Sequence, residues 1–432
     1  MTEEMAVQPN LDTKTRVKSI LGGSAGNLVE WYDWYIYAAF TLYFAHAFFP
    51  KGSQTAQLLQ AAAIFAVGFL MRPIGAWIMG VYSDKKGRKS GLTLSVTLMC
   101  IGSLMIAISP THDQIGIFAP IILVVARLIQ GLSVGGEYGA VATYMSELGL
   151  KGQRGFFASF QYVTLSGGQL LASLLGVILL GFMTEQQLND GGWRIPFVIG
   201  GVAALLSLAA RSRLEETLSN EDAEREESGS LIALLKQHWK TFLLVVGYTS
   251  AGSLTFYVVT VYSKTYLTNI GMDGKTVGFI MTTALFVFMI AQPFFGMLSD
   301  RIGRRASMLA FSLLSAIFIY PVMVTGMRSF ADSPVIITLL LIFLMMLLSF
   351  YTSISGLVKA EMFPPHVRAL GVGFSYAVGN ALFGGSAPSV ALLFKDAGIE
   401  NTFFVYVIIM LIICFFCSWA LPKKPEYLEH DH

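Results

Sequence analysis

Long apolar segments, each separated from the next by a short polar stretch, follow one another along almost the whole chain. A helix needs roughly 20 largely apolar residues to cross about 30 Å of hydrocarbon. The pattern therefore predicts an all-α membrane protein with twelve spanning helices, six before and six after a longer polar gap. They are expected near residues 18–46, 56–82, 90–109, 117–146, 154–183, 194–212, 240–268, 276–299, 306–327, 335–362, 367–394 and 401–421.

The polar gap between the sixth and seventh apolar segments is rich in acidic residues. It contains Glu215, Glu216, Glu221, Asp222, Glu224, Glu226 and Glu227. Because a charge run of this kind favours water, we expect a cytoplasmic linker over residues 213–239. This linker separates an N-terminal six-helix bundle, residues 1–212, from a C-terminal six-helix bundle with a short cytoplasmic tail, residues 240–432.

The composition supports a surface that faces lipid. Hydrophobic residues make up 54% of the 432 residues and charged residues only 13%, too few to cover a water-soluble protein of this size. The net charge of +2 argues against a nucleic-acid partner. The sequence contains no phosphate-binding loop, metal cluster or nucleophile–base motif, so we expect no cofactor, no metal and no enzymatic activity. Cys414 and Cys417 lie in an apolar run, where a lipid-facing helix is expected rather than a redox motif.

Lysine and arginine are distributed unequally between the two sides of the expected membrane. The loops on the side of the N-terminus contain most of them, including the clusters at 85–89 and 301–305. The opposite side has only Lys51, Arg194, Lys275, Arg328 and Lys395. Since positive residues accumulate in cytoplasmic loops, both termini are expected in the cytoplasm.

The two halves of the sequence repeat. Residues 80–89, GVYSDKKGRK, recur as residues 296–305, GMLSDRIGRR, 216 positions later. Glu147 and Arg154 are followed at nearly the same offset by Glu361 and Arg368. The two matches indicate a duplicated bundle, an architecture in which secondary transporters bind substrate between the halves.

Several charged residues lie well inside the expected spans. They are Glu30, Asp33, Arg72, Arg127 and Glu137. A charge at mid-membrane costs about 3 kcal/mol on insertion scales, so such a residue usually faces a cavity or a partner. On the first helix, Asn27, Glu30, Asp33 and Tyr37 are three or four positions apart and share one face. This polar stripe indicates a water-filled cavity.

The repeated loops, of the form G-x-x-x-D-[RK]-x-G-[RK]-[RK], resemble the signature of the major facilitator superfamily. The segment RLIQGLSVGGE, residues 127–137, resembles its fourth-helix motif. Segments 26–33, 69–75, 192–197 and 359–364 resemble the metabolite:proton symporter family within it. The resemblance implies two pseudo-symmetric six-helix bundles, alternating access and a place in a bacterial cytoplasmic (inner) membrane.

By the same resemblance, the repeated loops hold the two bundles together on the cytoplasmic side. The residues expected in this gate are Asp84, Arg88, Glu147, Arg154, Asp300, Arg304, Glu361 and Arg368. Charge pairing and carboxylates near helix N-termini supply the physical basis. The alternative is that these loops serve only to set the membrane topology. That role would explain their basic residues but not their aspartates.

An anionic substrate needs positive charge, and a guanidinium group can grip a carboxylate with two parallel hydrogen bonds. We expect Arg72 and Arg127 to anchor it, unless Arg72 pairs with a first-helix carboxylate instead. Lys359 is a third candidate, unless it extends to water from the inner end of its helix, as Lys264 is expected to do at an outer end. The site would be completed by Gln130, Tyr32, Gln161, Tyr257, Tyr351 and Asn380.

Proton coupling needs a carboxylate whose proton binding responds to its surroundings. Burial favours the neutral form and a nearby arginine favours the charged form, so an arginine shared with the substrate can switch it. Glu30 and Asp33 are the first candidates, followed by Glu137. The alternative is a permanent salt bridge from Glu30 or Asp33 to Arg72 or Arg127.

The function implied by the resemblance is proton-coupled transport of a small organic anion by a monomer embedded in the lipid bilayer. Segments 159–164 and 349–356 resemble the family members that carry the dicarboxylate 2-oxoglutarate. Another organic acid, such as citrate or shikimate, is the main alternative substrate, followed by proline or betaine. A metabolite receptor that does not transport is the alternative from a different class.

Overall fold

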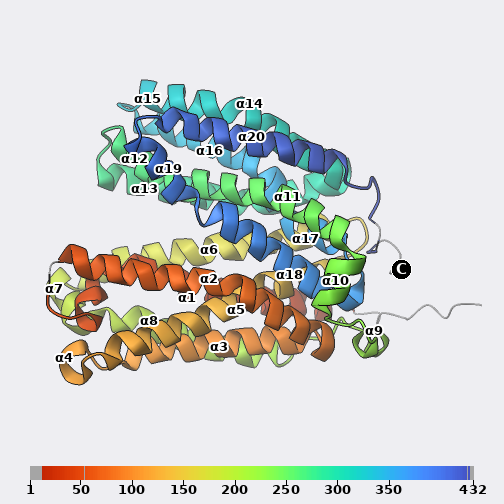
Figure 1. Cartoon of the computed structure of the whole chain (residues 1–432), viewed down its shortest axis with the longest axis horizontal. Helices are drawn as coiled ribbons and strands as arrows, with labels where there is room; N and C mark the ends of the chain where they lie inside the picture. Colours follow the sequence, from red (N-terminus) through yellow and green to blue (C-terminus); the bar gives the residue numbers. More distant parts are fainter. Residues whose placement is uncertain (1–11, 53, 426, 429–432) are drawn as a thin grey trace, which may run out of the picture.

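The computed structural model of the chain describes residues 12–52, 54–425 and 427–428, and these residues form helices without any strand. Figure 1 shows the long helices running along the long axis of the molecule in two groups, one from each half of the chain. We call these groups the N-half and the C-half. The end at which α1 begins and α9 and α10 lie is called the linker end.

The N-half contains six long helices, as the apolar pattern predicts. They are α1 (Thr13–Phe48), α2 (Gln54–Lys86), α3 (Arg88–Ile108), α5 (Phe118–Leu148), α6 (Arg154–Phe182) and α8 (Arg194–Arg211). A short α4 (His112–Ile115) follows α3, and α7 (Glu185–Gln187) with a π-helical turn (Leu188–Gly192) precedes α8. Helix α1 starts five residues before the predicted position because Asp12 caps it, accepting a hydrogen bond from the Thr15 N–H at 3.1 Å.

The C-half also supplies six spans, and most of them are interrupted. The first is α11 (Trp239–Tyr257), a π-helical turn (Val258–Tyr262) and α12 (Ser263–Asn269). It is followed by α13 (Gly274–Ile302), α14 (Arg304–Tyr320) with a π-helical turn (Pro321–Gly326) and α15 (Met327–Ser329), and α16 (Pro334–Thr352) with α17 (Ser355–Ala360). The last two are a 3-10 turn (Pro365–Val367), α18 (Arg368–Gly379), a π-helical turn (Asn380–Gly384) and α19 (Ala387–Asp396), then α20 (Glu400–Trp419).

The acidic linker is partly helical. It contains α9 (Asn220–Glu224), which Ser219 caps, and α10 (Leu231–Gln237), which Ser230 caps. The first of these helices places Glu221 and Asp222 in its first turn, where negative charge stabilises a helix N-terminus. The division of the chain at residues 212/213 and 239/240 stays a prediction.

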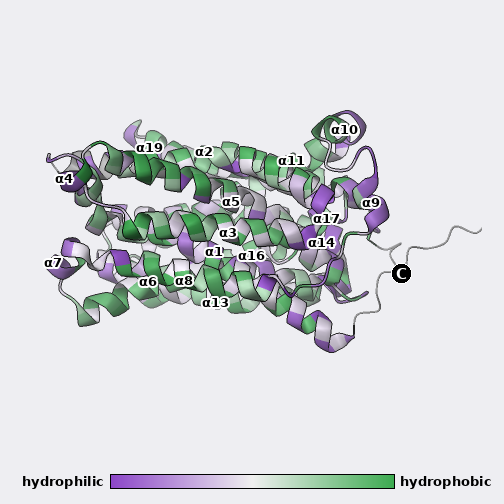
Figure 2. Ribbon diagram, turned by 90° about the horizontal axis from the view of Figure 1, so that it is seen from below, coloured by the Kyte–Doolittle hydropathy of each residue, from purple (hydrophilic) through white to green (hydrophobic). Residues whose placement is uncertain are grey.

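The helices have the length and the polarity of membrane spans. In the described part of the chain, ten helical segments are long and apolar enough to cross a membrane. Helices α1 and α2, with 36 and 33 residues, also exceed the roughly 20 residues that a span needs. Figure 2 shows hydrophobic residues along the helices and hydrophilic residues gathered at their ends. The predicted all-α membrane fold with twelve spans is confirmed.

The two halves approach each other closely at glycines. Helix α6 packs against α13, while α18 packs against α2 and α5. A Cβ atom on Gly296 of α13 would lie only 2.3 Å from the Gly155 carbonyl oxygen of α6. Because no side chain separates these backbones, the halves can make direct polar contacts at the linker end.

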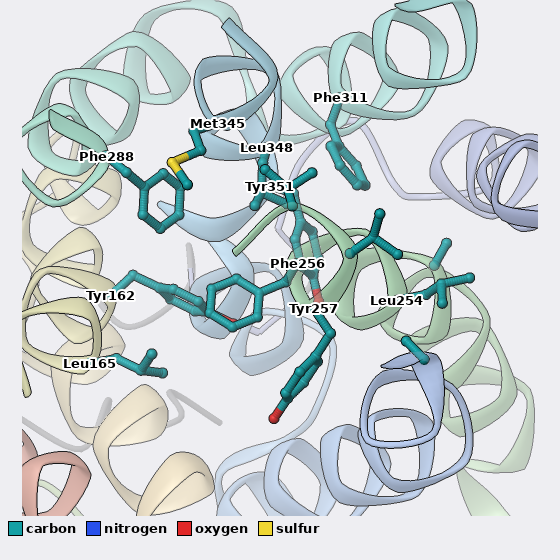
Figure 3. Close-up of a cluster of buried hydrophobic side chains, with 14 of the residues drawn as sticks. Tyr162, Leu165, Leu254, Phe256, Tyr257, Phe288, Phe311, Met345, Leu348 and Tyr351 are labelled. Carbon is teal, nitrogen blue, oxygen red and sulfur yellow. The ribbon is translucent and has the colours of Figure 1, made fainter. Parts of the chain in front are cut away.

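An aromatic cluster joins the halves further along the interface. Figure 3 shows Tyr162 of α6 facing Phe256 of α11, with Phe288 of α13 close by. The ring centroids of Tyr162 and Phe256 are 5.9 Å apart with nearly perpendicular planes, and those of Phe256 and Phe288 are 6.4 Å apart. Edge-to-face contacts of this kind add to the burial of the rings, so the cluster holds the interface closed at this level.

Candidate functional site

The first repeated loop contacts the start of a helix in the other half. Asp84, at the end of α2, accepts hydrogen bonds from the backbone N–H groups of Ala369 (3.1 Å) and Leu370 (2.9 Å) in the first turn of α18. Arg88 also pairs with Asp84, at 2.5 Å. The first N–H groups of a helix have no partner within the helix and carry its positive dipole end, so the Asp84 carboxylate joins α2 to α18.

The second repeated loop makes the equivalent contact in the opposite direction. Asp300, near the end of α13, accepts hydrogen bonds from the N–H groups of Gly155 (2.7 Å) and Phe156 (3.0 Å) at the start of α6. Arg304 lies 2.9 Å from Asp300. Each half therefore places one aspartate on a helix N-terminus of its partner.

Two glutamates extend these contacts into a charge network. Glu147 pairs with Arg88 at 3.1 Å and, across the interface, with Arg368 at 2.9 Å. Glu361 pairs with Arg304 at 3.2 Å. Arg154 donates to the Leu428 carbonyl oxygen near the C-terminus and is an electrostatic neighbour of Glu361. All eight residues predicted for the gate thus lie in one region at the linker end, which we call the clasp.

The two candidate anchoring arginines lie together over aromatic rings. The guanidinium carbon of Arg72 is 4.5 Å from the Trp34 ring centroid and 4.0 Å from that of Phe69. That of Arg127 is 4.1 Å from the Trp34 centroid and 4.3 Å from that of Tyr37. Such cation–π contacts stabilise a desolvated cation by about 2 kcal/mol or more. The aromatic face of α1 thus holds two positive charges near each other.

Hydrogen bonds complete the surroundings of these arginines. Arg72 Nη1 donates to the Tyr257 hydroxyl at 3.4 Å, and Arg127 Nη1 donates to Gln130 Oε1 at 2.9 Å. Among the described residues, Arg72 forms no ion pair with Glu30 or Asp33, because Glu30 pairs elsewhere. The alternative that Arg72 pairs with a first-helix carboxylate is therefore wrong for this conformation.

A cavity of about 380 Å³ lies between the halves beyond these arginines, on the side away from the linker end. Trp34, Phe69 and Tyr257 form part of its lining. The Phe69 and Tyr257 ring centroids are 6.3 Å apart, and Arg72 contacts both residues. Since Arg72 is only 3% exposed, the rings separate its charge from the cavity. A volume of this size suits a small metabolite.

Only some of the remaining predicted substrate residues lie near the two arginines or the cavity. Gln130 lies beside Arg127, and Tyr257 lines the cavity. Asn380 is buried, and neither polar atom of its amide has a hydrogen-bond partner in the described structure. By contrast, Tyr32 donates to the Pro196 carbonyl inside the N-half, and Gln161 donates to the Tyr138 carbonyl. The structure does not bring those two residues to the arginines.

Lys359 is fully buried at the interface of the halves. The alternative that it extends to water is therefore wrong, while its role in the substrate site stays a prediction. Its ammonium donates to the Ser355 hydroxyl (2.6 Å), the Tyr138 hydroxyl (3.1 Å) and the Tyr351 hydroxyl (3.3 Å). Ring centroids surround it at 5.2 to 5.7 Å, from Tyr138, Tyr248, Tyr351 and Tyr376. Because Tyr138 belongs to α5 of the N-half, this cage exists only while the halves are together.

Arg211 was not identified from the sequence, although it organises two of the three proton candidates. Its Nη1 lies 3.4 Å from Glu30 Oε1 and 3.0 Å from Glu137 Oε2, while its Nη2 donates to Glu137 Oε1. The predicted alternative of a salt bridge from Glu30 to Arg72 or Arg127 is wrong here. The only signal was a basic residue at the end of an apolar segment, which also fits a topology-setting charge.

The Arg211 cluster contains two carboxyl groups and one guanidinium group, all fully buried within the N-half. Ser95 and Ser133 donate hydrogen bonds to Glu30 Oε2 at 3.2 and 3.0 Å. With both carboxyl groups ionised, the cluster would hold one uncompensated negative charge, which is costly in a buried site. Asp33 lies beside Ser103 and Gly200 and forms no ion pair with another described residue.

Comparisons with known proteins identify the class. Residues 20–228 match the family model "Sugar (and other) transporter" and residues 243–431 match the "Major Facilitator Superfamily" model. The chain belongs to the major facilitator superfamily, as the repeated loops predict.

Among its relatives, the "Alpha-ketoglutarate permease" of Escherichia coli (strain K12) is 53% identical over 414 residues, covering 96% of this chain and 95% of that protein. A "Citrate-proton symporter" of Klebsiella pneumoniae is 31% identical, covering 87% of this chain and 85% of that protein. These relatives are transporters rather than enzymes.

Solved structures show the same fold. The proton:xylose symporter XylE bound to 6-bromo-6-deoxy-D-glucose superposes with a TM-score of 0.80 at 17% identity, covering 98% of this chain and 99% of that chain. The Escherichia coli fucose:proton symporter superposes with a TM-score of 0.67 at 17% identity, covering 94% of this chain and all of that chain. At this identity the likeness concerns the fold alone.

Replacing Arg211 tests the buried cluster. We expect Arg211→Gln to destabilise the protein by about 3–5 kcal/mol, because it leaves Glu30 and Glu137 buried without their cation. The measurement is the thermal Tm in detergent. Arg213→Gln, at an exposed position two residues later, is the matched control and should leave Tm unchanged. The double change Glu137→Gln with Arg211→Gln should recover part of the loss, and a wild-type Tm for Arg211→Gln alone would contradict the assignment.

Weakening the clasp should expose the linker end. Asp84→Asn keeps the side-chain shape but removes the charge that binds the start of α18. The reporter is Ala142→Cys, at a buried position of α5, in a protein whose native cysteines have been replaced. We expect several-fold faster maleimide labelling in the Asp84→Asn background, because the halves separate more often. Asp113→Asn, exposed at the other end, is the control, and equal labelling rates in both backgrounds would refute the clasp.

Proposed function

We propose that this protein carries 2-oxoglutarate together with protons into a bacterial cell across the inner membrane, by alternating access. The observation that carries the proposal is the 53% identity to a named alpha-ketoglutarate permease over 96% of the chain. The pair of buried arginines over Trp34 agrees with it, because a dicarboxylate needs two positive charges.

In the proposed cycle the substrate first occupies the 380 Å³ cavity between the halves. Its carboxylates reach Arg72 and Arg127 when the ring wall of Phe69 and Tyr257 rearranges. A carboxylate offers a guanidinium two charge-assisted hydrogen bonds, whereas the rings offer only their faces. The substrate therefore replaces aromatic contacts with stronger ones, and this gain drives closure around it.

The clasp gives the cycle its orientation. We propose that the linker end faces the cytoplasm, which agrees with the excess of basic residues in its loops. Closure at this end leaves the central cavity on the outer side. The protein as described is then closed to the cytoplasm and ready to receive an external anion. We propose that a single chain completes the cycle, because the cavity and both arginines lie within one chain.

Protons compensate the charge of the substrate. A dianion that enters with one proton moves net negative charge inward, which an inside-negative potential opposes by about 2.3 kcal/mol per 100 mV. We therefore propose at least two protons per substrate. Glu30 and Glu137, which share Arg211, are one proton site because they would otherwise leave a negative charge buried. Asp33, buried beside Ser103, is the other candidate.

Uptake into proteoliposomes tests substrate and anchor together. With an imposed pH gradient, acidic outside, we expect accumulation of labelled 2-oxoglutarate, blocked best by unlabelled 2-oxoglutarate. Arg127→Ala should lower uptake at sub-saturating substrate roughly 10- to 100-fold, since a hydrogen-bonded charge contributes about 1.5–3 kcal/mol. Arg127→Lys, which keeps the charge, is the control and should retain part of the activity.

The competitors decide between substrates. Citrate, shikimate, proline and betaine are offered unlabelled in the same assay. Gradient-driven uptake of citrate with none of 2-oxoglutarate would refute the proposed substrate while keeping a proton symporter. Binding of 2-oxoglutarate without accumulation under any gradient would indicate a receptor and would refute transport.

A further inference from the structure

The lining of the central cavity contains a single charged residue, Lys264, among the described residues that form it. Most of the lining is aromatic or small and apolar, including Trp34, Phe69 and Tyr257. Gln169 and Ser173 are polar and also line the cavity. The position of these few polar groups therefore determines where an anion can bind before it reaches the buried arginines.

Lys264 lies on the cavity face of the first span of the C-half. Tyr257, Val261 and Lys264 are spaced four and three positions apart, and all three line the cavity. The π-helical turn Val258–Tyr262 lies between Tyr257 and Lys264 and changes the register of the helix. The sequence interpretation of Lys264 as a residue that extends to water explains its exposure but not this alignment with the cavity.

The ammonium group of Lys264 is available for a ligand. Within the described residues, no hydrogen bond or ion pair involves its Nζ atom, and the side chain is exposed. By contrast, Arg72 and Arg127 are 3% and 0% exposed, and neither belongs to the described lining of the cavity. An anion that enters the cavity in this conformation therefore meets the charge of Lys264 first.

Gln169 and Ser173 present polar groups from the other half. They are four positions apart on α6 and share one face of that helix. Gln169 Oε1 is buried without a hydrogen-bond partner, and its Nε2 donates no hydrogen bond to another described residue. A carboxylate between the halves can accept hydrogen bonds from the Gln169 amide and the Ser173 hydroxyl while it pairs with Lys264.

We propose that Lys264, Gln169 and Ser173 form an outer subsite that binds one carboxylate of the substrate before it reaches Arg72 and Arg127. This inference rests on the proposed function as a dicarboxylate carrier. A positive charge at the wall of a narrow cavity concentrates anions locally. Because Lys264 belongs to the C-half and Gln169 to the N-half, a carboxylate held by both draws the outer ends together.

The subsite also distinguishes the two sides of the membrane. Lys264 lies at the outer end, so it acts on substrate that arrives from outside and not on substrate that arrives at the cytoplasmic side. Its loss should therefore raise the KM for external substrate, while the maximal rate and the KM for internal substrate stay unchanged. A residue that merely supports the fold would change both sides together.

Kinetics of Lys264→Gln in oriented proteoliposomes tests the subsite. We expect a five- to twenty-fold higher KM for external 2-oxoglutarate, an unchanged Vmax and an unchanged KM from inside. Lys264→Arg, which keeps the charge, should restore most of the affinity. The matched control is Lys275→Gln, which removes an exposed lysine at the same end that lines a different groove, on α13 and α16. It should leave the external KM at the wild-type value.

Three results would overturn the inference. The first is an unchanged external KM in Lys264→Gln, with or without a lower Vmax. The second is an equal rise in Lys264→Gln and Lys275→Gln, which would indicate general surface charge. The third is an equal rise on both sides of the membrane. Each of these leaves the proposed function standing, provided that the wild-type protein accumulates 2-oxoglutarate. If the wild-type protein does not, the proposed function fails and the subsite fails with it.

Discussion

Buried charge is the constraint on which the rest of this structure depends, because lipid offers ionised groups neither water nor counter-ions. Several of the buried charged side chains have protein partners, and these partners are of different kinds. Asp84 and Asp300 bind backbone N–H groups, Arg72 lies against aromatic rings and Lys359 is enclosed by tyrosines. Glu30 forms an ion pair with Arg211. The location of each partner decides what happens when the protein changes conformation.

Contacts between partners in different halves must break when the halves separate, and this raises the free energy of the conformational change. The clasp and the Lys359 cage both cross the interface, so opening the linker end breaks them together. The Arg211 cluster lies wholly inside the N-half and survives that movement as a unit. The clasp and the Arg211 cluster, which we propose as gate and proton site, thus occupy different structural settings. The clasp consists of contacts between the halves, whereas the Arg211 cluster balances its charges within the N-half.

The fold could be predicted from sequence because lipid imposes simple rules of length and polarity. The twelve apolar segments and the repeated loops identified the spans and the superfamily. The π-helical turns Val258–Tyr262, Pro321–Gly326 and Asn380–Gly384 were not predicted, and the first of them contains no proline or glycine to indicate a break. The clasp residues were found from their repeat, although the repeat did not show that Glu147 pairs with Arg368 of the other half.

Pairing inside the site could not be read from the sequence, because it depends on which helix faces come together. Arg211 ends an apolar segment and has the same appearance as a topology-setting charge. Lys359 was a substrate candidate with extension to water as the alternative, and its burial became evident only from the tyrosines that α5, α11, α16 and α18 contribute around it. The candidate arginines were recognised individually, whereas their common contact with Trp34 required the structure.

The most direct test of the account is the number of protons that move with each substrate. In proteoliposomes, the 2-oxoglutarate gradient is varied against a fixed pH gradient until net flux stops, first without and then with a membrane potential. The account predicts two or more protons per 2-oxoglutarate, with inside-negative potential leaving uptake unopposed or assisting it. A ratio below two, with uptake opposed by that potential, would contradict it.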